Sequence, residues 1–458
     1  MLSSETPDQT PGLQIPQLHS PFTVTESNDN VKSEIRSRDF KIGFTPVNAV
    51  KFRDALFGYD ESEINFIFEG FMNGFPLNIT LENIRPYTNN LKSALELPDI
   101  VQLKLDKELK AGRIAGPFDE KPFENFHASP LGVVEKKVAG TYRLIHHLSY
   151  PEGESVNDSI RNDFCTVQYS TIQNAIQVIK QLGRHSQLAK ADIEAAYRIV
   201  PLHPSNFHFL GFIWKEKYYY DRCLPMGLSE SCKLFERISS ALEWIAVNKL
   251  GASGVVHVLD DFLFVERTVN NCTRTRQRFE CLCKAVGIPL APEKTCGPST
   301  NIQFLGITLD SDLMEARLPA DKLSKCWDLL DRYSNKKKIS LRDLQSMIGT
   351  LQFATSVVLP GRTFLRRLID LTIGIRRRFY MIRLNSGARS DIAIWKNILE
   401  NYNGQTFFLY DVWLTTHSFR IGGASLAAHN GLSDSQIRQL GRWRSDAFRK
   451  YIRPSSLK

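Results

Sequence analysis

Apolar residues recur with helical spacing through the first part of the chain, after a polar beginning. Residues 1–45 are rich in Ser, Thr, Pro, Asn and charged side chains and poor in aliphatic ones, which predicts a disordered N-terminal tail. Aromatic and aliphatic residues from Phe52 to Phe75 have a helix-like rhythm. The stretch from Leu91 to Gly112 predicts one or two amphipathic helices, with a boundary at Pro98. We therefore expect a helical N-terminal extension over residues 46–110.

The middle of the chain changes to short strand-like runs. Residues Ser129 to Val134 and Thr141 to Ile145 flank a polar Ala139-Gly140 turn, which predicts a β-hairpin with basic residues on both arms. Strand-like and helix-like segments then alternate as far as Leu309. From Lys322 to Ile382 the pattern becomes helical and basic. Together these patterns predict an α+β fold.

Three segments follow from these changes of pattern. Residues 111–310 form the mixed region, and residues 311–400 form a helical region. Residues 401–458 form a separate short segment. Within it, Thr415 to Tyr451 has the pattern of two short helices, with Ser433 at the N-cap of the second.

Composition and charge narrow the class of protein only slightly. The 458 residues suffice for two to four domains, and the formal net charge of +9 favours polyanionic partners. No run of 18 apolar residues and no signal-like N-terminus are present, so we expect neither a membrane span nor a membrane partner. The eight cysteines include no CxxC pair and suit a reducing intracellular compartment, nuclear or cytoplasmic.

The most informative chemistry is a pair of adjacent carboxylates, Asp260 and Asp261, inside the apolar run from Val255 to Val265. Such a run predicts two buried strands with the pair at the turn between them. An Asp pair on its own more often belongs to a solvated turn, but these apolar flanks favour burial. Buried like charges repel unless they are neutralised, and divalent cations with oxygen ligands do this well.

Asp192 follows a second short apolar stretch and supplies a third carboxylate. Together Asp192, Asp260 and Asp261 can hold two Mg²⁺ or Mn²⁺ ions roughly 3.5–4 Å apart, the spacing of two-metal phosphoryl chemistry. One ion would activate an attacking hydroxyl, and the other would neutralise a leaving pyrophosphate. The three residues are therefore both the predicted metal ligands and predicted catalytic residues.

A family resemblance follows from the order of these motifs. Asp192 with an aromatic five residues later, then Leu224 to Ser229, then Leu259-Asp260-Asp261, resembles motifs A, B and C of reverse transcriptases. The resemblance implies a right-hand polymerase with fingers and palm over residues 111–310, an antiparallel palm sheet, and a helical thumb or connection over residues 311–400. It also implies an RNA template, a DNA primer and product, dNTP substrates and two Mg²⁺ or Mn²⁺ ions.

The same resemblance assigns roles to further side chains. Tyr197 matches the steric gate that rejects ribose 2′-hydroxyls, and Pro225-Met226-Gly227 matches the segment that contacts the template and the incoming nucleotide. Lys136 and Arg143 resemble the fingers residues that hold the triphosphate. Lys294 resembles a motif D lysine that protonates pyrophosphate, which makes it a further predicted catalytic residue.

Wider flanks narrow the resemblance to one group of retroelements. The segments 90–95, 112–118, 143–151 and 359–362 look like those of DIRS-type or Ngaro-type retrotransposon polymerases. This resemblance covers roughly residues 45–408.

The end of the chain resembles a different enzyme. His417 and Arg420, then Trp443 and Tyr451, look like the C-terminal motifs of a tyrosine recombinase, although Arg442 fits the third position by its distance from Tyr451. In that family the Tyr attacks a DNA phosphate while Arg and His stabilise the transition state and move a proton. The resemblance implies a short all-α fragment that contacts DNA, too short to keep recombinase activity.

Three functions therefore stay open at this point. The first is an RNA-directed DNA polymerase of a DIRS-like element. The second is the product of a decayed element that binds nucleic acid without catalysis, because an RNase H region is missing and the recombinase part is truncated. The third is a tyrosine recombinase that acts in DNA integration and recombination.

Overall fold

The computed structural model describes residues 40–80, 84–136, 138–401, 404–406 and 433–440. The chain divides into two units, Met1–Lys41 and Ile42–Lys458, and the elements below belong to the second. Most of the predicted disordered tail lies outside the described residues. No helix in these ranges combines the length and apolar character needed to cross a membrane.

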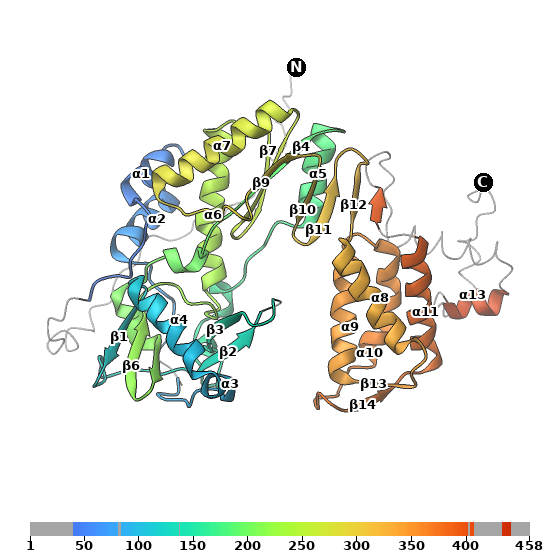
Figure 1. Cartoon of the computed structure of the whole chain (residues 1–458), viewed down its shortest axis with the longest axis horizontal. Coiled ribbons are helices and arrows are strands. Elements are labelled where there is room, and N and C mark those ends of the chain that lie inside the picture. The colour runs from blue at the N-terminus through green and yellow to red at the C-terminus, as the bar shows by residue number, and fades with distance from the viewer. Residues whose placement is uncertain (1–39, 81–83, 137, 402–403, 407–432, 441–458) are drawn as a thin grey trace, which may run out of the picture. The chain divides into compact units, whose positions relative to one another are not determined.

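Four helices open the described chain (Figure 1). The helix-like rhythm from Phe52 to Phe75 forms two helices, because Gly58 takes a positive φ of 93° and Asp60 caps a new helix through the Glu63 N–H. Pro98 stands at the start of a helix, as its fixed φ and missing N–H allow. The bounds are α1 (Ala49–Ala55), α2 (Glu61–Asn73), α3 (Lys92–Glu96) and α4 (Pro98–Lys110).

Two small antiparallel sheets follow. The predicted hairpin is confirmed, with Leu131 paired to His146 and Glu135 to Tyr142. A three-stranded sheet has the order β1-β6-β5, and it shares a core with α3, α4 and the hairpin. The bounds are β1 (Ile114–Phe118), β2 (Leu131–Glu135), β3 (Tyr142–His146), β5 (Gly211–Trp214) and β6 (Lys217–Asp221).

The central sheet has the order β7-β8-β4-β9, and every pairing in it is antiparallel. Alternate residues of β8 face opposite sides. Phe262 and Phe264 pack on Phe279 of α7, whereas Leu263 and Val265 join the core that contains α5. The bounds are α5 (Ile172–Leu182), β4 (Gln187–Asp192), α6 (Ser231–Asn248), β7 (Gly254–Val258), β8 (Asp261–Glu266), α7 (Val269–Val286) and β9 (Cys296–Ser299).

Short 3-10 helices connect these elements. They are η1 (Asn157–Ser159), η2 (Asn162–Phe164), η3 (Ala196–Ile199), η4 (Pro204–Phe209) and η5 (Leu359–Leu365).

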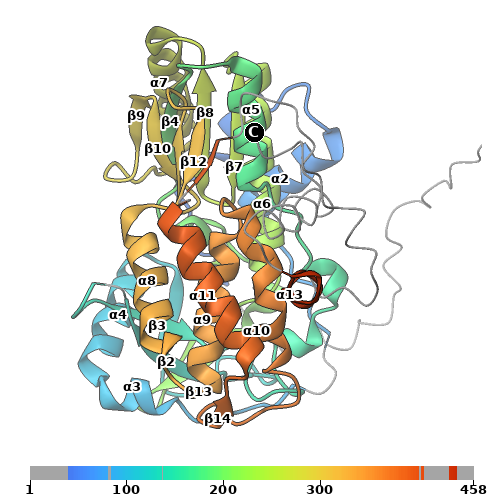
Figure 2. The ribbon, with the colours of Figure 1, turned by 90° about the vertical axis from the view of Figure 1, so that its right-hand side faces the viewer.

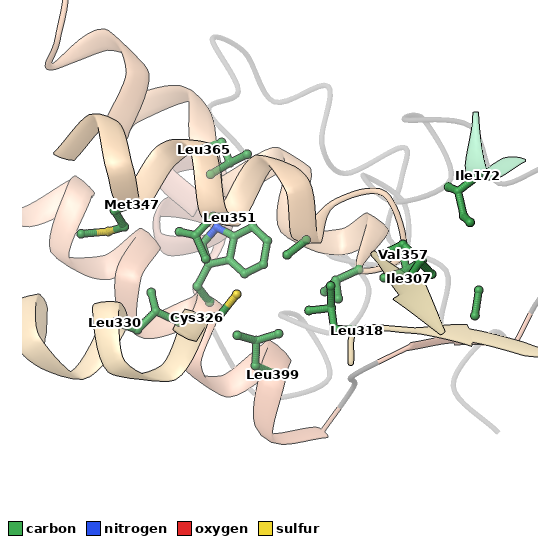
Figure 3. Close-up of a cluster of buried hydrophobic side chains, with 14 of the residues drawn as sticks. Ile172, Ile307, Leu318, Cys326, Leu330, Met347, Leu351, Val357, Leu365 and Leu399 are labelled. Carbon is green, nitrogen blue, oxygen red and sulfur yellow. The ribbon is translucent and has the colours of Figure 1, made fainter. Parts of the chain in front are cut away.

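A second four-stranded sheet has the order β10-β11-β12-β15; its first three strands precede a helical bundle in the chain, and β15 follows the bundle (Figure 2). Buried side chains of both belong to one cluster with α5 and the central sheet (Figure 3). The bounds are β10 (Asn301–Phe304), β11 (Ile307–Asp310), β12 (Glu315–Arg317), α8 (Ala320–Ser334), α9 (Leu341–Ala354), α10 (Arg366–Asp370), α11 (Ser386–Asn401), β15 (Gly404–Thr406) and α13 (Asp434–Leu440).

The bundle departs from the purely helical pattern predicted for Lys322 to Ile382. Two short strands, β13 (Lys338–Ser340) and β14 (Met381–Arg383), pair antiparallel within it. The pairing sets Ile339 opposite Ile382 and buries both side chains, which a helix period does not predict.

Packing explains why residue 361, in the segment 359–362 named above, is a glycine. A Cβ on Gly361 would lie 2.1 Å from the ring of Trp395, a fully buried side chain of α11. Only glycine lets the backbone approach the indole so closely.

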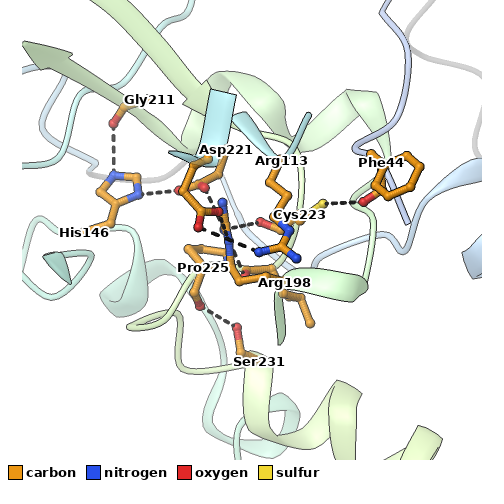
Figure 4. Close-up of polar contacts among 11 residues, drawn as sticks. Phe44, Arg113, His146, Arg198, Gly211, Asp221, Cys223, Pro225 and Ser231 are labelled. Atoms are coloured by element: carbon orange, nitrogen blue, oxygen red, sulfur yellow. Dashed lines mark hydrogen bonds and ion pairs between the residues drawn. The ribbon is translucent and has the colours of Figure 1, made fainter. Parts of the chain in front are cut away.

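A buried ionic network joins residues of α4, β3, η3 and β6 (Figure 4). Arg198 of η3 contacts Asp221 at 2.7 Å and Glu108 of α4 at 2.9 Å, and His146 Nδ1 lies 2.8 Å from Asp221. Burial opposes the Asp221 charge, but Arg198 and His146 outweigh it and hold the pKa of that carboxyl below its usual range. The network anchors η3, which includes Tyr197.

Replacing Arg198 by Ala tests how far the fold depends on this network. The substitution leaves the buried Asp221 carboxylate with half of its partners, so the free energy of unfolding should fall by about 3–5 kcal/mol in urea denaturation. Arg161→Ala is the matched control, because its ion pair with Asp163 is exposed, and its effect should stay within about 0.5 kcal/mol. Equal effects of the two variants would contradict the assignment.

Candidate active site

The three predicted carboxylates meet at one end of the central sheet. Asp192 is the last residue of β4 and Asp261 the first of β8, and the two are direct cross-strand partners. Asp260 lies in the two-residue turn between β7 and β8, and its carbonyl accepts a hydrogen bond of 3.0 Å from the Ile193 N–H. The predicted strands and the turn between them are confirmed, except that Asp261 begins β8 and only Asp260 lies in the turn. The backbone alone brings the three residues together.

The carboxylates are poorly solvated and repel one another. Asp192 is 3% exposed, and Asp260 and Asp261 are half-buried. Burial, followed by the charge of the neighbouring carboxylates, raises the pKa of Asp260. Burial also raises the pKa of Asp261, although Lys190 opposes the shift from 3.9 Å away. The site therefore carries an electrostatic cost that a cation would relieve.

Lys294 supplies part of that relief. Lys294 lies three residues after Ala291, whose N–H donates to the Asp192 carbonyl at 2.8 Å and so holds this segment beside β4. The Lys294 ammonium lies 2.7 Å from Asp192 Oδ1, and this hydrogen bond, helped by the other two carboxylates, raises the pKa of the lysine. Lys294 is thus a protonated donor at the predicted site.

The three carboxylates are the kind of ligand that a hard divalent cation prefers, but their side chains are not close enough together to hold one as they stand. Among the described residues, no three His, Cys, Asp or Glu side chains are arranged closely enough to hold a metal ion as they stand. The oxygen donors and raised pKa values nevertheless suit Mg²⁺ or Mn²⁺ at Asp192, Asp260 and Asp261. A metal ion at Asp192 Oδ1 would compete with Lys294 for that oxygen.

Tyr197 lies at the edge of the same site, half-buried. Its ring packs edge-on against Phe235 of α6 at 5.6 Å, and its hydroxyl lies 3.1 Å from Cys232 Sγ. Burial, then the thiol of Cys232, raises the pKa of Tyr197, so the side chain is a neutral phenol at any ordinary pH. The ring is held from two sides, by Phe235 and by Cys232.

The Pro225-Met226-Gly227 segment forms a turn before α6. Gly227 has a φ of 119°, and a Cβ there would lie 2.7 Å from the His146 carbonyl oxygen. Asn157 holds the turn from outside, since its side chain donates to the Gly227 carbonyl at 2.7 Å and accepts from the Ser229 N–H at 2.9 Å. Ser231 donates to the Pro225 carbonyl at 3.1 Å (Figure 4). Met226 stays exposed.

Lys136 and Arg143 lie on the β2–β3 hairpin. Arg143 is opposite Val134 in the register, and Lys136 follows the end of β2, where its N–H donates to the Thr141 carbonyl at 2.7 Å. Both side chains are exposed, and no ion pair or hydrogen bond within the described residues ties either side chain to the three carboxylates.

The predicted recombinase residues cannot be placed. His417, Arg420, Trp443 and Tyr451 lie outside the described residues, as does Arg442. Of that segment, the structure gives α13, with Ser433 directly before it as predicted, and the Ile437 N–H bonded to the Ser433 carbonyl at 2.9 Å.

Sequence reasoning missed several residues of the site. Lys190 lies two residues before Asp192 on β4, so strand alternation alone places both on one face of the sheet. That signal was available. Cys232 and Asn157 act on Tyr197 and Gly227 from distant segments, and nothing in their local sequence indicates this.

Comparison with known proteins gives a family for the centre of the chain. Residues 134–309 match the family model described as reverse transcriptase (RNA-dependent DNA polymerase). This segment contains every predicted polymerase residue named above, from Lys136 to Lys294.

Curated relatives are viral polyproteins. The Gag-Pro-Pol polyprotein of Human T-cell leukemia virus 3 is 27% identical over 166 residues, which are 36% of this chain and 11% of that protein. Polyprotein P3 of Commelina yellow mottle virus is 23% identical over 248 residues, 52% of this chain and 12% of the relative. The Gag-Pro-Pol polyprotein of Bovine leukemia virus is 24% identical over 367 residues, 76% of this chain and 23% of the relative. The chain thus spans under a quarter of each.

Solved structures agree on the fold. The foamy viral protease-reverse transcriptase in complex with RNA/DNA hybrid has a TM-score of 0.54 at 15% identity, covering 81% of this chain and 48% of that one. The same enzyme in complex with dsDNA has a TM-score of 0.53 at 17% identity, covering 81% of this chain and 75% of that one. The predicted polymerase fold of mixed helix and sheet is confirmed, and so is the predicted enzyme class, at the level of the domain. The chain carries a reverse transcriptase domain.

Proposed function

We propose that the chain is an RNA-directed DNA polymerase that extends a primer 3′-hydroxyl by two-metal nucleotidyl transfer. One observation carries the proposal: Asp192, Asp260 and Asp261 converge at one end of an antiparallel sheet, inside the segment that matches the reverse transcriptase family. We propose the fingers, palm and thumb of a right hand for this architecture.

The chain's own residues divide the work between them. Asp192, Asp260 and Asp261 would hold two Mg²⁺ or Mn²⁺ ions, which supply Lewis acidity to the attacking hydroxyl and the leaving pyrophosphate. Lys294, protonated beside Asp192, is placed to give a proton to the departing pyrophosphate. Lys190 limits the repulsion around Asp261 while the site is empty of substrate.

Other residues would select and orient the nucleotide. Tyr197, held by Phe235 and Cys232, would close the space needed by a ribose 2′-hydroxyl and so favour dNTPs. The Gly227 turn offers bare backbone to the nucleotide and template. Lys136 and Arg143, whose side chains are exposed on the β2–β3 hairpin, would bind the triphosphate of the incoming nucleotide.

We further propose a DIRS-type or Ngaro-type retroelement origin. The support is sequence alone: the segments that resemble these polymerases, and the recombinase-like residues from His417 to Tyr451. In this proposal the C-terminal segment records a fusion to a tyrosine recombinase that contacted DNA. A recombinase function for the chain itself is the weakest alternative, because the resemblance covers only the end of such a domain.

Primer extension tests the polymerase. Wild-type protein should extend a DNA primer on an RNA template with Mg²⁺ or Mn²⁺, and Asp260→Asn should reduce the rate by about 10³-fold or more, because one of the three carboxylates that would hold the metal ions is lost. Asp54→Asn is the matched control, an exposed carboxylate of α1 with one weak partner, and should extend normally. A folded wild type that extends no primer would reject the proposal.

Thermal stability tests the metal site without catalysis. The raised pKa values of Asp260 and Asp261 mean that ionising them costs the folded state, and this cost grows as pH rises through those pKa values. At pH 7.5 without divalent ions, Asp260→Asn should therefore raise the melting temperature by about 2 °C or more. Mn²⁺ should stabilise the wild type, and the variant should lose most of that gain. Equal Mn²⁺ shifts in both would contradict the assignment.

A second candidate function, nucleic-acid binding without catalysis, rests on a basic surface of the bundle. We call this surface the basic strand pair: the strands β13 and β14 with their flanks, whose cations are Lys336, Lys337, Lys338, Arg342, Arg376, Arg377, Arg378 and Arg383. All eight are exposed, and none has an ion-pair partner within the described part of the chain. The register sets Lys338 directly opposite Arg383, a repulsive pairing that a polyanion would relieve.

Exposed aromatic side chains interrupt the same surface. Phe379 and Tyr380 are 74% and 55% exposed, directly after Arg376–Arg378. Aromatic faces beside cations suit stacking with unpaired bases as well as contact with phosphates. This composition supports a binding role that would persist after loss of catalysis.

Salt dependence measures that role. A triple variant, Arg376→Ala, Arg377→Ala and Arg378→Ala, should weaken binding to a primed template and flatten the slope of log K against log salt by about 2–3. The matched control removes three exposed arginines elsewhere, Arg267, Arg274 and Arg278, and should change the slope by less than about 1. Identical slopes for wild type and triple variant would remove the basic strand pair from the binding surface.

A further inference from the structure

A row of three ionisable side chains lies directly behind the turn that carries Asp260 and Asp261. Glu236 and Glu243 come from α6, and His257 comes from β7. His257 is 4% exposed, and its ring stacks on Phe262 at 5.3 Å. None of the three belongs to a motif that the polymerase proposal uses, yet one of them, Glu236, reaches the backbone of the β7–β8 turn.

That turn has an unusual backbone. Leu259 is the first of its two central residues and has a φ of 53°, in the left-handed region. In hairpin turns with a positive φ at this position, glycine is preferred, because a side chain there costs free energy. A non-glycine residue keeps such a conformation only where its surroundings determine it.

Glu236 supplies one of those determinants. Its Oε2 accepts a hydrogen bond of 3.2 Å from the N–H of Leu259, the residue directly before the two aspartates. A carboxylate is a stronger acceptor for this N–H than a neutral group. The Glu236 side chain is 15% exposed, so little water competes for the contact.

His257 and Glu243 fix Glu236 in turn. His257 Nε2 lies 3.2 Å from Glu236 Oε1, so the two side chains form an ion pair, although the geometry at Nε2 is not that of a hydrogen bond. His257 Nδ1 contacts Glu243. Burial disfavours charge on the imidazole, but the two glutamates outweigh the burial and raise the pKa of His257 to about 9. The imidazolium therefore neutralises an acid that would otherwise add to the repulsion at the site.

We infer that Glu236 is a positioning residue of this active site, which holds the Leu259 turn so that Asp260 and Asp261 present their carboxylates to the metal ions, with His257 and Glu243 fixing its orientation. The inference rests on the proposed polymerase function and adds residues to it. In this proposal Glu236 is not itself a metal ligand and acts through its hydrogen bond with the Leu259 N–H. Release of that peptide would let the turn relax and misplace both ligands, and misplacements of about 1 Å cost catalysis heavily.

Three substitutions separate positioning from simple stability. Glu236→Ala removes both the acceptor and the charge, whereas Glu236→Gln keeps an acceptor for the Leu259 N–H. Glu69→Gln is the matched control, since Glu69 is an exposed glutamate of α2 whose side chain accepts a hydrogen bond from Asn73 and has no part in the proposal. Each variant is compared with wild type in the full chain by thermal melting, by Mn²⁺ titration calorimetry on the protein with a primed template, and by steady-state primer extension.

For Glu236→Ala we expect a loss of kcat of about 10-fold or more and a weaker Mn²⁺ affinity, with the template Kd unchanged. Glu236→Gln should recover most of kcat and of Mn²⁺ affinity even if its melting temperature equals that of Glu236→Ala. Glu69→Gln should stay close to wild type in both. This pattern would distinguish a positioning role of Glu236 from a merely stabilising one. If Glu236 only stabilised the fold, two variants with equal melting temperatures should have equal kcat and Mn²⁺ affinity.

Wild-type Mn²⁺ affinity and kcat in a folded Glu236→Ala protein would overturn the inference. If Glu236→Ala does not fold, the Gln variant decides: it overturns the inference if it loses kcat and Mn²⁺ affinity as far as Asp260→Asn does, and supports it if it keeps both. A wild type that binds Mn²⁺ but extends no primer would instead reject the polymerase proposal and leave the metal-site geometry standing.

Discussion

Mutual repulsion among three carboxylates, one buried and two half-buried, is the constraint on which this structure depends. Antiparallel pairing of β4 with β8 forces Asp192 and Asp261 to face each other, and the β7–β8 turn adds Asp260. Burial raises the pKa of both members of the Asp pair, so the folded state carries an unfavourable term at neutral pH. A chain selected only for stability would not keep this arrangement, which is why we treat it as functional.

Neighbouring lysines reduce the repulsion among the three carboxylates without abolishing it. Lys294 contacts Asp192, and Lys190 lies near Asp261, so two cations oppose three acids. Complete neutralisation would remove the affinity for divalent ions, because a cation gains most where negative charge stays uncompensated. The lysines therefore set a balance: enough relief for folding, and enough remaining charge to attract metal. Elsewhere, the buried Asp221 is fully paired with Arg198 and His146, as a structural carboxylate should be.

Much of this could be predicted from local sequence, and the limits have physical reasons. The hairpin, the boundary at Pro98 and the buried strands around Asp260-Asp261 follow from periodicity and turn residues, which act between neighbours in the chain. The β13–β14 pair was missed because three-residue strands joined across a long connection leave no period to detect. Glu236 was missed because its partner, the Leu259 N–H, is a backbone group, and backbone groups have no sequence signal.

The row behind the turn shows how the same electrostatic problem is managed one layer deeper. A glutamate is a strong acceptor for the Leu259 N–H, but its charge would add to that of three carboxylates already in conflict. A neutral glutamine would avoid the conflict and hold the strained peptide less firmly. The chain instead keeps the carboxylate and adds a buried His257, which Glu236 and Glu243 keep protonated. The positive charge of His257 offsets the negative charge of Glu236. Glu236 can therefore hold the Leu259 N–H without adding to the repulsion among Asp192, Asp260 and Asp261.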